Sequence, residues 1–539
     1  MGSLFDKHME EIIKQQPSTI EILHHQIEED YKKMRIFRIL SLTILDHLVL
    51  GDIHLDFCQN GKPGTTVEEI HSSVVIGANG IGKSYLLRAV ADIFCLLDSI
   101  KANPEELKNE VKFKFRIKYV IYGFTFEFGN FSDVNPVDSY HKTLNHYWYK
   151  RDGLEVTITT MDLPVRIIGS TMTVTDKFNT VGPERYRYKG IRNENSPGTT
   201  GTRTVIRKTV NGLMHSLDVK ASFREEVKHL LEALGFEPKM EVSYSIRYKD
   251  YFLKEDMTAE QLKSIFVNQR QIFEGKRTTE LWGTRYFEKI KEDREKLERA
   301  AIFLRYAAER NNGKNKRSVI ISYNVLENDD IVLDRDAIEI LSSLDLLTFP
   351  SLKVYKKEPF DFSESSSGET HVLCQLLGIM SDIEHGSLIL IDEPENSTHP
   401  NWQISYIGWL KEIFKAYYDC HFIISTHSHF ILSDLQPESS DIIALEKKDN
   451  VIKDVADGLN TFNWSVDDIL YEVFHVRNVK NEALERDLER AFQLIDEGGP
   501  LKKEEIDILL TRFKNVYRGE RDPLRKLIIE LEDYAKSRS

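Results

Sequence analysis

Eight consecutive residues have the types and spacing of a phosphate-binding loop. The octapeptide fits the pattern GxxxxGK[ST] and consists of Gly77, Ala78, Asn79, Gly80, Ile81, Gly82, Lys83 and Ser84. It follows an apolar run, residues 73–76, and precedes a run with one apolar face, residues 85–94. Between a strand and a helix, the backbone N–H groups of such a loop face phosphates, the lysine adds positive charge and the hydroxyl can bind Mg²⁺. The pattern predicts a site for a nucleoside triphosphate and Mg²⁺.

Two neighbouring acids far downstream could complete such a site. Residues 387–391 form an apolar run that ends in Asp392 and Glu393. This Walker B pattern would place Asp392 near Mg²⁺, with water between them, and Glu393 could orient or deprotonate an attacking water. An apolar strand that ends in two acids is common in proteins. The interpretation therefore depends on the motifs around it.

A serine-rich segment and a group of histidines flank the two acids. Ser366 and Gly368 stand where a helical pattern begins, which is also an ordinary place for a helix cap. Downstream, residues 421–425 form a second apolar run, and His427 follows it. His429 is a rival for any role of His427. We expect His399 to shape the loop after the acids rather than to contact a nucleotide.

The order of these four motifs resembles that of the ABC ATPase superfamily, and the asparagine-containing phosphate loop is similar to the RecF/SMC-like branch. The resemblance implies ATP as the nucleotide and His427 as the switch histidine that senses the γ-phosphate. It also implies homo-oligomers in which two heads clamp ATP. Ser366 and Gly368 of one head would then contact the nucleotide of the other, so that nucleotide state controls assembly.

A finer resemblance involves the segments between these motifs. Residues 165–170, 176–178 and 186–192, together with residues 392–395 and 427–430, resemble the PtuA-like ATPases of Septu anti-phage systems and of some retron systems. That likeness implies a partner HNH nuclease of the PtuB type and, in retron systems, a reverse transcriptase with its RNA–DNA product. Plain packing and surface charge would explain Tyr186, Tyr188 and Arg192 equally well.

Two other functions remain open at this stage. One is a RecF-like DNA-repair ATPase that remodels complexes on DNA, and the other is an ATP-gated scaffold with negligible turnover. We recognise neither an acidic set of the TOPRIM type nor an HNH-type Cys/His cluster in the sequence. We therefore expect this ATPase to have no nuclease site of its own.

Composition limits the classes of partner. The 539-residue chain carries a net charge of −14, which argues against a surface dominated by nucleic-acid binding. Binding to nucleic acid remains open through basic stretches at residues 203–208 and 270–277. The four cysteines show no CxxC spacing, and no apolar stretch reaches membrane-spanning length. We expect a cytoplasmic protein with no membrane segment.

The patterns predict an α/β fold, a P-loop ABC-ATPase head with an added antiparallel β subdomain. Alternating residues at 111–119 and a hairpin at 36–57 indicate that subdomain. The longest helical pattern, residues 289–310, is too short for the arms of an SMC protein. We expect five regions: a helical arm (1–34), the head's N-terminal lobe with Walker A and the β subdomain (35–205), a mostly helical insertion (206–316), the head's C-terminal lobe (317–455) and a C-terminal helical, partner-docking region (456–539).

Overall fold

The computed structural model describes most of the chain in two compact units, residues 1–464 and 465–539. The described residues are 36–57, 69–103, 110–131, 147–192, 202–268, 283–311, 319–348, 350–356, 359–361, 367–436, 438–448, 451–455, 486–491, 493, 503–516, 528–529 and 531–532. The predicted N-terminal arm lies outside them. The predicted mixed α/β architecture is confirmed.

A seven-stranded sheet forms the centre of the first unit. Its strand order is β17-β16-β3-β15-β14-β8-β9, and only β17 pairs antiparallel with its neighbour. Parallel strands covered on both faces read as continuous apolar runs, as the central strands here do. Because parallel strands end at one edge, the residues that follow them meet there. The strands are β3 (His71–Gly77), β8 (Ile167–Thr171), β9 (Tyr186–Gly190), β14 (Leu388–Asp392), β15 (His421–Ser425), β16 (Ser440–Lys448) and β17 (Val451–Asp454).

A six-stranded antiparallel sheet packs with the central sheet around helix α3 (Lys83–Ala102). It has the order β2-β1-β4-β5-β6-β7, which confirms the predicted β subdomain and its hairpin. Alternating residues of these strands are buried, and Tyr119 packs edge-on against Phe94 of α3. The strands are β1 (Arg38–His47), β2 (Gly51–Asp56), β4 (Lys114–Ile121), β5 (Phe124–Gly129), β6 (Trp148–Arg151) and β7 (Leu154–Glu155).

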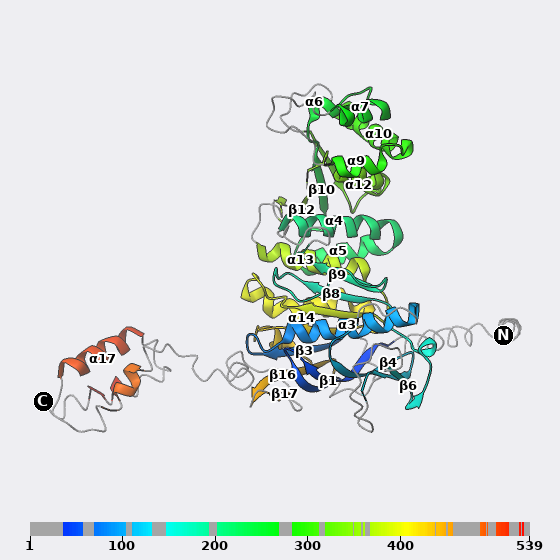
Figure 1. Ribbon diagram of the computed structural model, residues 1–539. Helices are drawn as coiled ribbons and strands as arrows, with labels where there is room; N and C mark the ends of the chain where they lie inside the picture. Colours follow the sequence, from blue (N-terminus) through cyan, green and yellow to red (C-terminus); the bar gives the residue numbers. More distant parts are fainter. Residues whose placement is uncertain are drawn as a thin grey trace, which may run out of the picture. The chain divides into compact units, whose positions relative to one another are not determined.

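A lobe of helices and a small sheet follows β9 in the chain. Figure 1 shows α13, α4 and α5 between β9 and the strands β10 and β12. The small sheet has the order β11-β10-β12-β13, with β10 (Met240–Ser245), β11 (Ile320–Asn324), β12 (Ser351–Tyr355) and β13 (Pro359–Asp361). The helices are α4 (Thr202–Val219), α5 (Phe223–Ala233), α6 (Lys249–Phe252), α7 (Ala259–Val267), α9 (Thr284–Ile290), α10 (Arg294–Asn311), α11 (Asp330–Leu333) and α12 (Arg335–Ser343).

The helix predicted over residues 289–310 starts later than predicted, because residues 289–290 belong to α9 (Thr284–Ile290) and α10 begins at Arg294. Asp293 stands at the break. Its Oδ1 accepts the N–H of Lys296 at 3.1 Å, and its carbonyl accepts that of Leu297 at 3.2 Å. Aspartate in this position satisfies the free N–H groups of a new helix, so α10 begins afresh.

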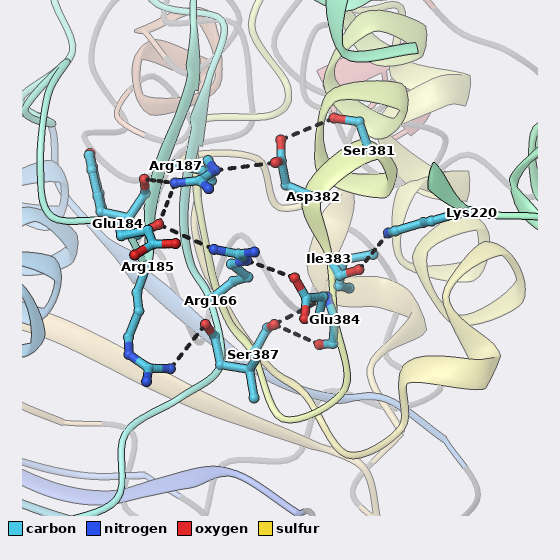
Figure 2. Close-up of polar contacts among 12 residues, drawn as sticks. Arg166, Glu184, Arg185, Arg187, Lys220, Ser381, Asp382, Ile383, Glu384 and Ser387 are labelled. Atoms are coloured by element: carbon cyan, nitrogen blue, oxygen red, sulfur yellow. Dashed lines mark hydrogen bonds and ion pairs between the residues drawn. The ribbon is translucent and has the colours of Figure 1, made fainter. Parts of the chain in front are cut away.

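Helix α13 (Ser367–Asp382) precedes β14 in the chain, and α14 (Pro400–Ile413) follows it. Figure 2 shows the polar contacts that fix the last residues of α13 against the start of β8 and β9. Arg187 pairs with Asp382 at 3.3 Å, and Arg166 donates to Glu384 at 2.8 Å. Lys220 donates to the carbonyl of Ile383 at 2.9 Å. Cations at this end of a helix also offset its negative dipole.

The sequence of the predicted C-terminal helical region has three amphipathic patterns, and the second unit contains α17 (Lys503–Val516), which is the middle one. Its apolar positions are buried, namely Ile506, Leu509, Leu510 and Phe513. In the first and third patterns several positions lie outside the described residues, namely Leu484, Phe492, Ile495, Leu524 and Leu527. Among the described helices of both units, none has the length and apolar character to cross a membrane.

Candidate nucleotide-binding site

The octapeptide joins the end of β3 to the start of α3, as the sequence predicts. Gly77 is the last residue of β3, the next five residues form the loop, and Lys83 and Ser84 open α3. A Cβ atom at Gly77 would lie 2.6 Å from the carbonyl oxygen of Leu445, and one at Gly82 would lie 2.7 Å from Leu50. Gly82 also has φ = +112°. Both positions therefore require glycine.

Lys83 is buried beneath the loop. Its Nζ donates to the carbonyl of Gly77 at 2.8 Å and lies 2.9 Å from Nδ1 and 2.8 Å from Nε2 of His427. Burial lowers the pKa of the Lys83 ammonium group to about 8, although the nearby carboxylates, led by Glu393, act in the opposite direction. The loop thus holds a partly desolvated amine where phosphate would gain most from positive charge.

Ser84 and Asp392 lie side by side. The Ser84 hydroxyl donates to Oδ1 of Asp392 at 3.0 Å, and the Ser425 hydroxyl donates to the same oxygen. Burial raises the pKa of the Asp392 carboxyl to about 6 against both hydrogen bonds. Hydroxyl and carboxylate oxygens are ligands that Mg²⁺ prefers, and a cation would offset the cost of a buried charge. These residues fit a Mg²⁺ site.

Glu393 follows β14 in an unusual backbone conformation, with φ = +49°. Its N–H donates to the carbonyl of Ser425 at 3.0 Å, and Oε1 lies 3.3 Å from Nε2 of His427. Oε2 accepts a hydrogen bond from Asn396 at 2.9 Å. The contact with His427 is the main cause that lowers the pKa of the Glu393 carboxyl, so this carboxyl is ionised at neutral pH.

Of the three histidines weighed from the sequence, His427 lies in this cluster. Its N–H donates to Oε1 of Glu395 at 2.5 Å, which fixes the backbone after β15. His429 packs on the ring of Phe430, with centroids 4.1 Å apart. The ring of His399 caps α14 by accepting the N–H of Asn401 at 3.3 Å.

Gly368 is the second residue of α13 and is buried against the turn that follows β14. A Cβ atom there would lie 2.2 Å from the carbonyl oxygen of Ser397, so the close approach requires glycine. The start of α13 thus contacts the turn that carries Glu393. Ser366 lies outside the described residues.

Three residues of the cluster were not predicted from the sequence to belong to the site, namely Thr173, Glu395 and Asn396. Glu395 and Asn396 follow Asp392 and Glu393 within three residues in the sequence, and their polarity beside a buried strand was an available signal. Thr173 carried no such signal, because its place follows from the pairing of β8 with β14.

The segment compared with PtuA-like proteins forms a polar cluster of its own. Asp176 accepts hydrogen bonds from Tyr188 at 2.8 Å and from Arg192 at 2.6 Å, and Tyr186 donates to the carbonyl of Asn179 at 2.7 Å. These contacts within the chain account for the three side chains. Of the basic stretches, residues 203–208 lie on α4, and residues 270–277 lie outside the described part.

Comparisons with known proteins give one family and several structures. Residues 72–433 match the family described as "AAA domain, putative AbiEii toxin, Type IV TA system". No curated protein matches the chain. Among solved structures, an Smc head domain with an extended coiled coil, bound to the C-terminal domain of ScpA from Pyrococcus furiosus, is 12% identical with a TM-score of 0.31, and the match covers 82% of this chain and 100% of that one.

Two further structures are similar at the same low level. The SMC head domain from Thermotoga maritima is 9% identical with a TM-score of 0.32, over 78% of this chain and 98% of that one. The recombination mediator protein RecF-ATPrS of the RecFOR pathway is 12% identical with a TM-score of 0.28, over 79% and 100%. Since the family match spans well over half of the chain and contains the whole cluster around Lys83, this protein belongs to the AAA-domain family of AbiEii-like ATPases.

Proposed function

We propose that this protein binds ATP with Mg²⁺ and hydrolyses it. The observation that carries the proposal is the meeting of Lys83, Ser84, Asp392, Glu393 and His427 at one edge of the central sheet. The first two come from the phosphate loop, and the others lie at the end of β14 or just after β14 and β15, more than 300 residues later in the sequence. Family membership supports the same chemistry.

Each of these residues has a distinct task in the proposed reaction. Backbone N–H groups of residues 77–82 and the ammonium of Lys83 hold the phosphates. Ser84 and Asp392 hold Mg²⁺, which supplies positive charge to the phosphate oxygens when bound. Glu393 accepts a proton from a water whose oxygen bonds to the γ-phosphorus as the bond to the β–γ bridging oxygen breaks. His427 lies where it can contact the γ-phosphate.

The same proposal includes a dimer of heads that encloses ATP. Ser366 and Gly368 of one copy would approach the γ-phosphate bound by the other, with the N-terminus of α13 directed at it. The contact between Gly368 and Ser397 supports a link between that helix and the turn holding Glu393. Hydrolysis would remove the phosphate that both heads share and loosen the dimer.

The wider role that we propose is control of a partner HNH nuclease, of the PtuB type, in anti-phage defence in the cytoplasm. The family description names a toxin of a type IV toxin–antitoxin system, which supports a role in a multi-component system. Residues 456–539 would dock the partner. Where the system is a retron, a reverse transcriptase with its RNA–DNA would join the complex.

Steady-state hydrolysis tests the ATPase proposal. The wild-type chain should release phosphate from ATP with Mg²⁺, Glu393→Gln should bind ATP without release, and Lys83→Ala should bind no ATP. Addition of EDTA should stop the wild-type reaction. Phosphate release that persists in Glu393→Gln would exclude Glu393 as the residue that activates water. Absence of turnover in the wild type, with ATP bound, would favour an ATP-gated scaffold.

Purification from the native operon, followed by mass spectrometry, tests the wider role. Recovery of a small HNH protein in a defined particle supports nuclease control. Recovery with repair proteins, together with duplex DNA binding that weakens steeply as salt rises, would replace that role by the RecF-like one. The ATPase proposal stands or falls separately, on phosphate release.

A further inference from the structure

One oxygen of Glu393 is held by two side chains from the segments that follow two different strands. Asn396, in the turn after β14, donates through Nδ2 to Oε2 at 2.9 Å. Thr173, two residues beyond β8, directs its hydroxyl at the same oxygen from 3.5 Å. β8 and β14 are paired in parallel, with Thr171 opposite Asp392. That pairing is what brings Thr173 beside Glu393.

The two side chains also bond to each other. Nδ2 of Asn396 lies 2.6 Å from Oγ1 of Thr173, in addition to its contact with Glu393. An amide nitrogen has two hydrogens, so it can donate to both acceptors at once. The Thr173 hydroxyl accepts one of them and keeps its own hydrogen for Oε2. The three side chains therefore form a closed triangle in which every hydrogen has an acceptor.

The triangle occupies one carboxylate oxygen of Glu393 and leaves the other available for contacts with other groups. With Oε2 held, Oε1 is the oxygen that faces His427, at 3.3 Å from Nε2. The last torsion of a glutamate side chain is soft, and a carboxylate without such contacts would rotate. The backbone supports the same orientation, because the N–H of Asn396 donates to the carbonyl of Glu393 at 3.2 Å.

We propose that Thr173 and Asn396 are positioning residues for hydrolysis, which hold the Glu393 carboxylate so that Oε1 faces the attacking water. The role rests on the proposed ATPase function. Both side chains are only half-buried, so core packing is a small part of what they contribute. Their effect passes through Glu393 alone. It should therefore alter kcat and leave nucleotide affinity unchanged.

The test compares kcat for ATP hydrolysis with the Kd for ATP in matched variants. Thr173→Val keeps the shape and removes the hydroxyl, and Thr173→Ser keeps the hydroxyl. Asn396→Asp keeps the shape but replaces both donated hydrogens by a carboxylate oxygen, which repels Oε2 of Glu393. We expect kcat to fall about 10-fold in Thr173→Val and about 10- to 100-fold in Asn396→Asp. In Thr173→Ser it should stay within about 3-fold of the wild-type value. The Kd for ATP should change less than about 3-fold throughout.

Two controls separate positioning from general damage to the fold. Thr160→Val removes a hydroxyl that bonds to a backbone carbonyl at 2.8 Å on the surface, and it should keep the wild-type kcat. In a Glu393→Gln background, Thr173→Val should cause no further change in phosphate release, because the carboxylate it positions is gone. The double variant Thr173→Val/Asn396→Asp should be little slower than Asn396→Asp alone.

The outcomes distinguish this role from the function on which it rests. A wild-type chain with no Glu393-dependent turnover would remove the ATPase proposal and the positioning role together. A wild-type chain that hydrolyses ATP, with Thr173→Val and Asn396→Asp equally active, would overturn only the positioning role. A rise in the Kd for ATP that matches the loss of rate would do the same, since it would place these residues in nucleotide binding.

Discussion

Nζ of Lys83 lies within 2.9 Å of both ring nitrogens of His427, so the lysine of the phosphate loop and the histidine after β15 share one polar cluster. The same imidazole lies 3.3 Å from Glu393. A single side chain thus contacts both the residue proposed to hold phosphate and the residue proposed to activate water. This arrangement is the basis of the first prediction.

His427→Ala should lower kcat for ATP hydrolysis by about 100-fold, because it removes a contact expected to strengthen as charge develops on the γ-phosphate. The Kd for ATP should change less than about 5-fold, since Lys83 and the loop remain. Phosphate release and ATP titration measure the two quantities. His429→Ala is the matched control and should keep the wild-type rate, because that ring packs on Phe430.

Gly368→Ala should separate the start of α13 from the turn after β14. Its Cβ would lie 2.2 Å from the carbonyl of Ser397, which is backbone and has to move. We expect at least about a 10-fold loss of ATP hydrolysis, measured as phosphate release. Gly378→Ala, on the same helix, meets nothing closer than 3.7 Å and should be neutral or stabilising. Equal activity of both variants would contradict a functional contact at Gly368.

Gly82→Ala tests how far the phosphate loop depends on its close packing. The change adds a Cβ atom 2.7 Å from Leu50 at a residue with φ = +112°. Strain and overpacking should together cost about 2–4 kcal/mol of unfolding free energy and abolish ATP binding. Gly123→Ala has a similar positive φ, +77°, and open space around it. It should cost only about 1–2 kcal/mol in urea unfolding and leave ATP binding intact.

Substitutions of two acidic residues, one at the end of α13 and one just beyond it, should lower the stability to different extents. The side chain of Asp382 is 20% exposed and pairs with both Arg187 and Lys189. Asp382→Asn should cost about 2–3 kcal/mol, because it leaves two half-buried cations short of a partner. The side chain of Glu384 is 43% exposed, so Glu384→Gln should cost less than about 1 kcal/mol. Chemical denaturation of the two variants measures the difference.

The fully buried His421 predicts a dependence of stability on pH. Burial lowers the pKa of its imidazole far below the usual value, and neighbouring His71 and Arg38 act in the same direction. Nδ1 accepts the N–H of Ile39 at 3.1 Å, so the proton is on Nε2, which faces Ser73. A second proton, on Nδ1, would face the N–H group of Ile39 that now donates to this nitrogen.

The direction of this pH dependence follows from the number of protons that the folded and the unfolded chain bind. Below pH 6.5 the unfolded chain protonates this residue and the folded chain does not, so folding is disfavoured as pH falls. We expect the unfolding free energy of the wild type to fall by about 1 kcal/mol more than that of His421→Gln between pH 6.5 and 5.5, because the unfolded imidazole is only half protonated at the upper limit. The comparison cancels the opposite contribution of Asp392 and the parallel contribution of His71, because burial raises the pKa of the first and lowers that of the second in both proteins. Parallel curves for the two proteins would contradict the prediction.

The parts of the site that depend on neighbours in sequence were predictable. A strand, a glycine-rich loop and a helix follow one another within residues 71–102, and Asp392 and Glu393 close an apolar run. Their meeting with His427 was expected from the motif order, through the resemblance. The partner of Glu393 on β8 was not, because Thr173 reaches it through strand pairing that no local pattern encodes.

Periodicity failed where a single side chain outweighed it. The helical pattern continues across residues 291–293, yet Asp293 caps a new helix there. An aspartate inside an amphipathic pattern has two uses, as a solvated residue of the helix or as its first cap, and spacing alone does not separate them. The capping contact to Lys296 decides between them in the folded chain.

The strand order has a consequence for how the protein is made. Strand β3, which carries the phosphate loop, lies between β15 and β16, so both of its neighbours come from after residue 420. Once Ser84 has been synthesised, more than 330 residues have to follow before the first residue of β15 is made. Such long-range pairing is slow to form. The phosphate loop therefore has no carboxylates beside it until Asp392 and Glu393 have been made, and His427 comes 34 residues after Glu393.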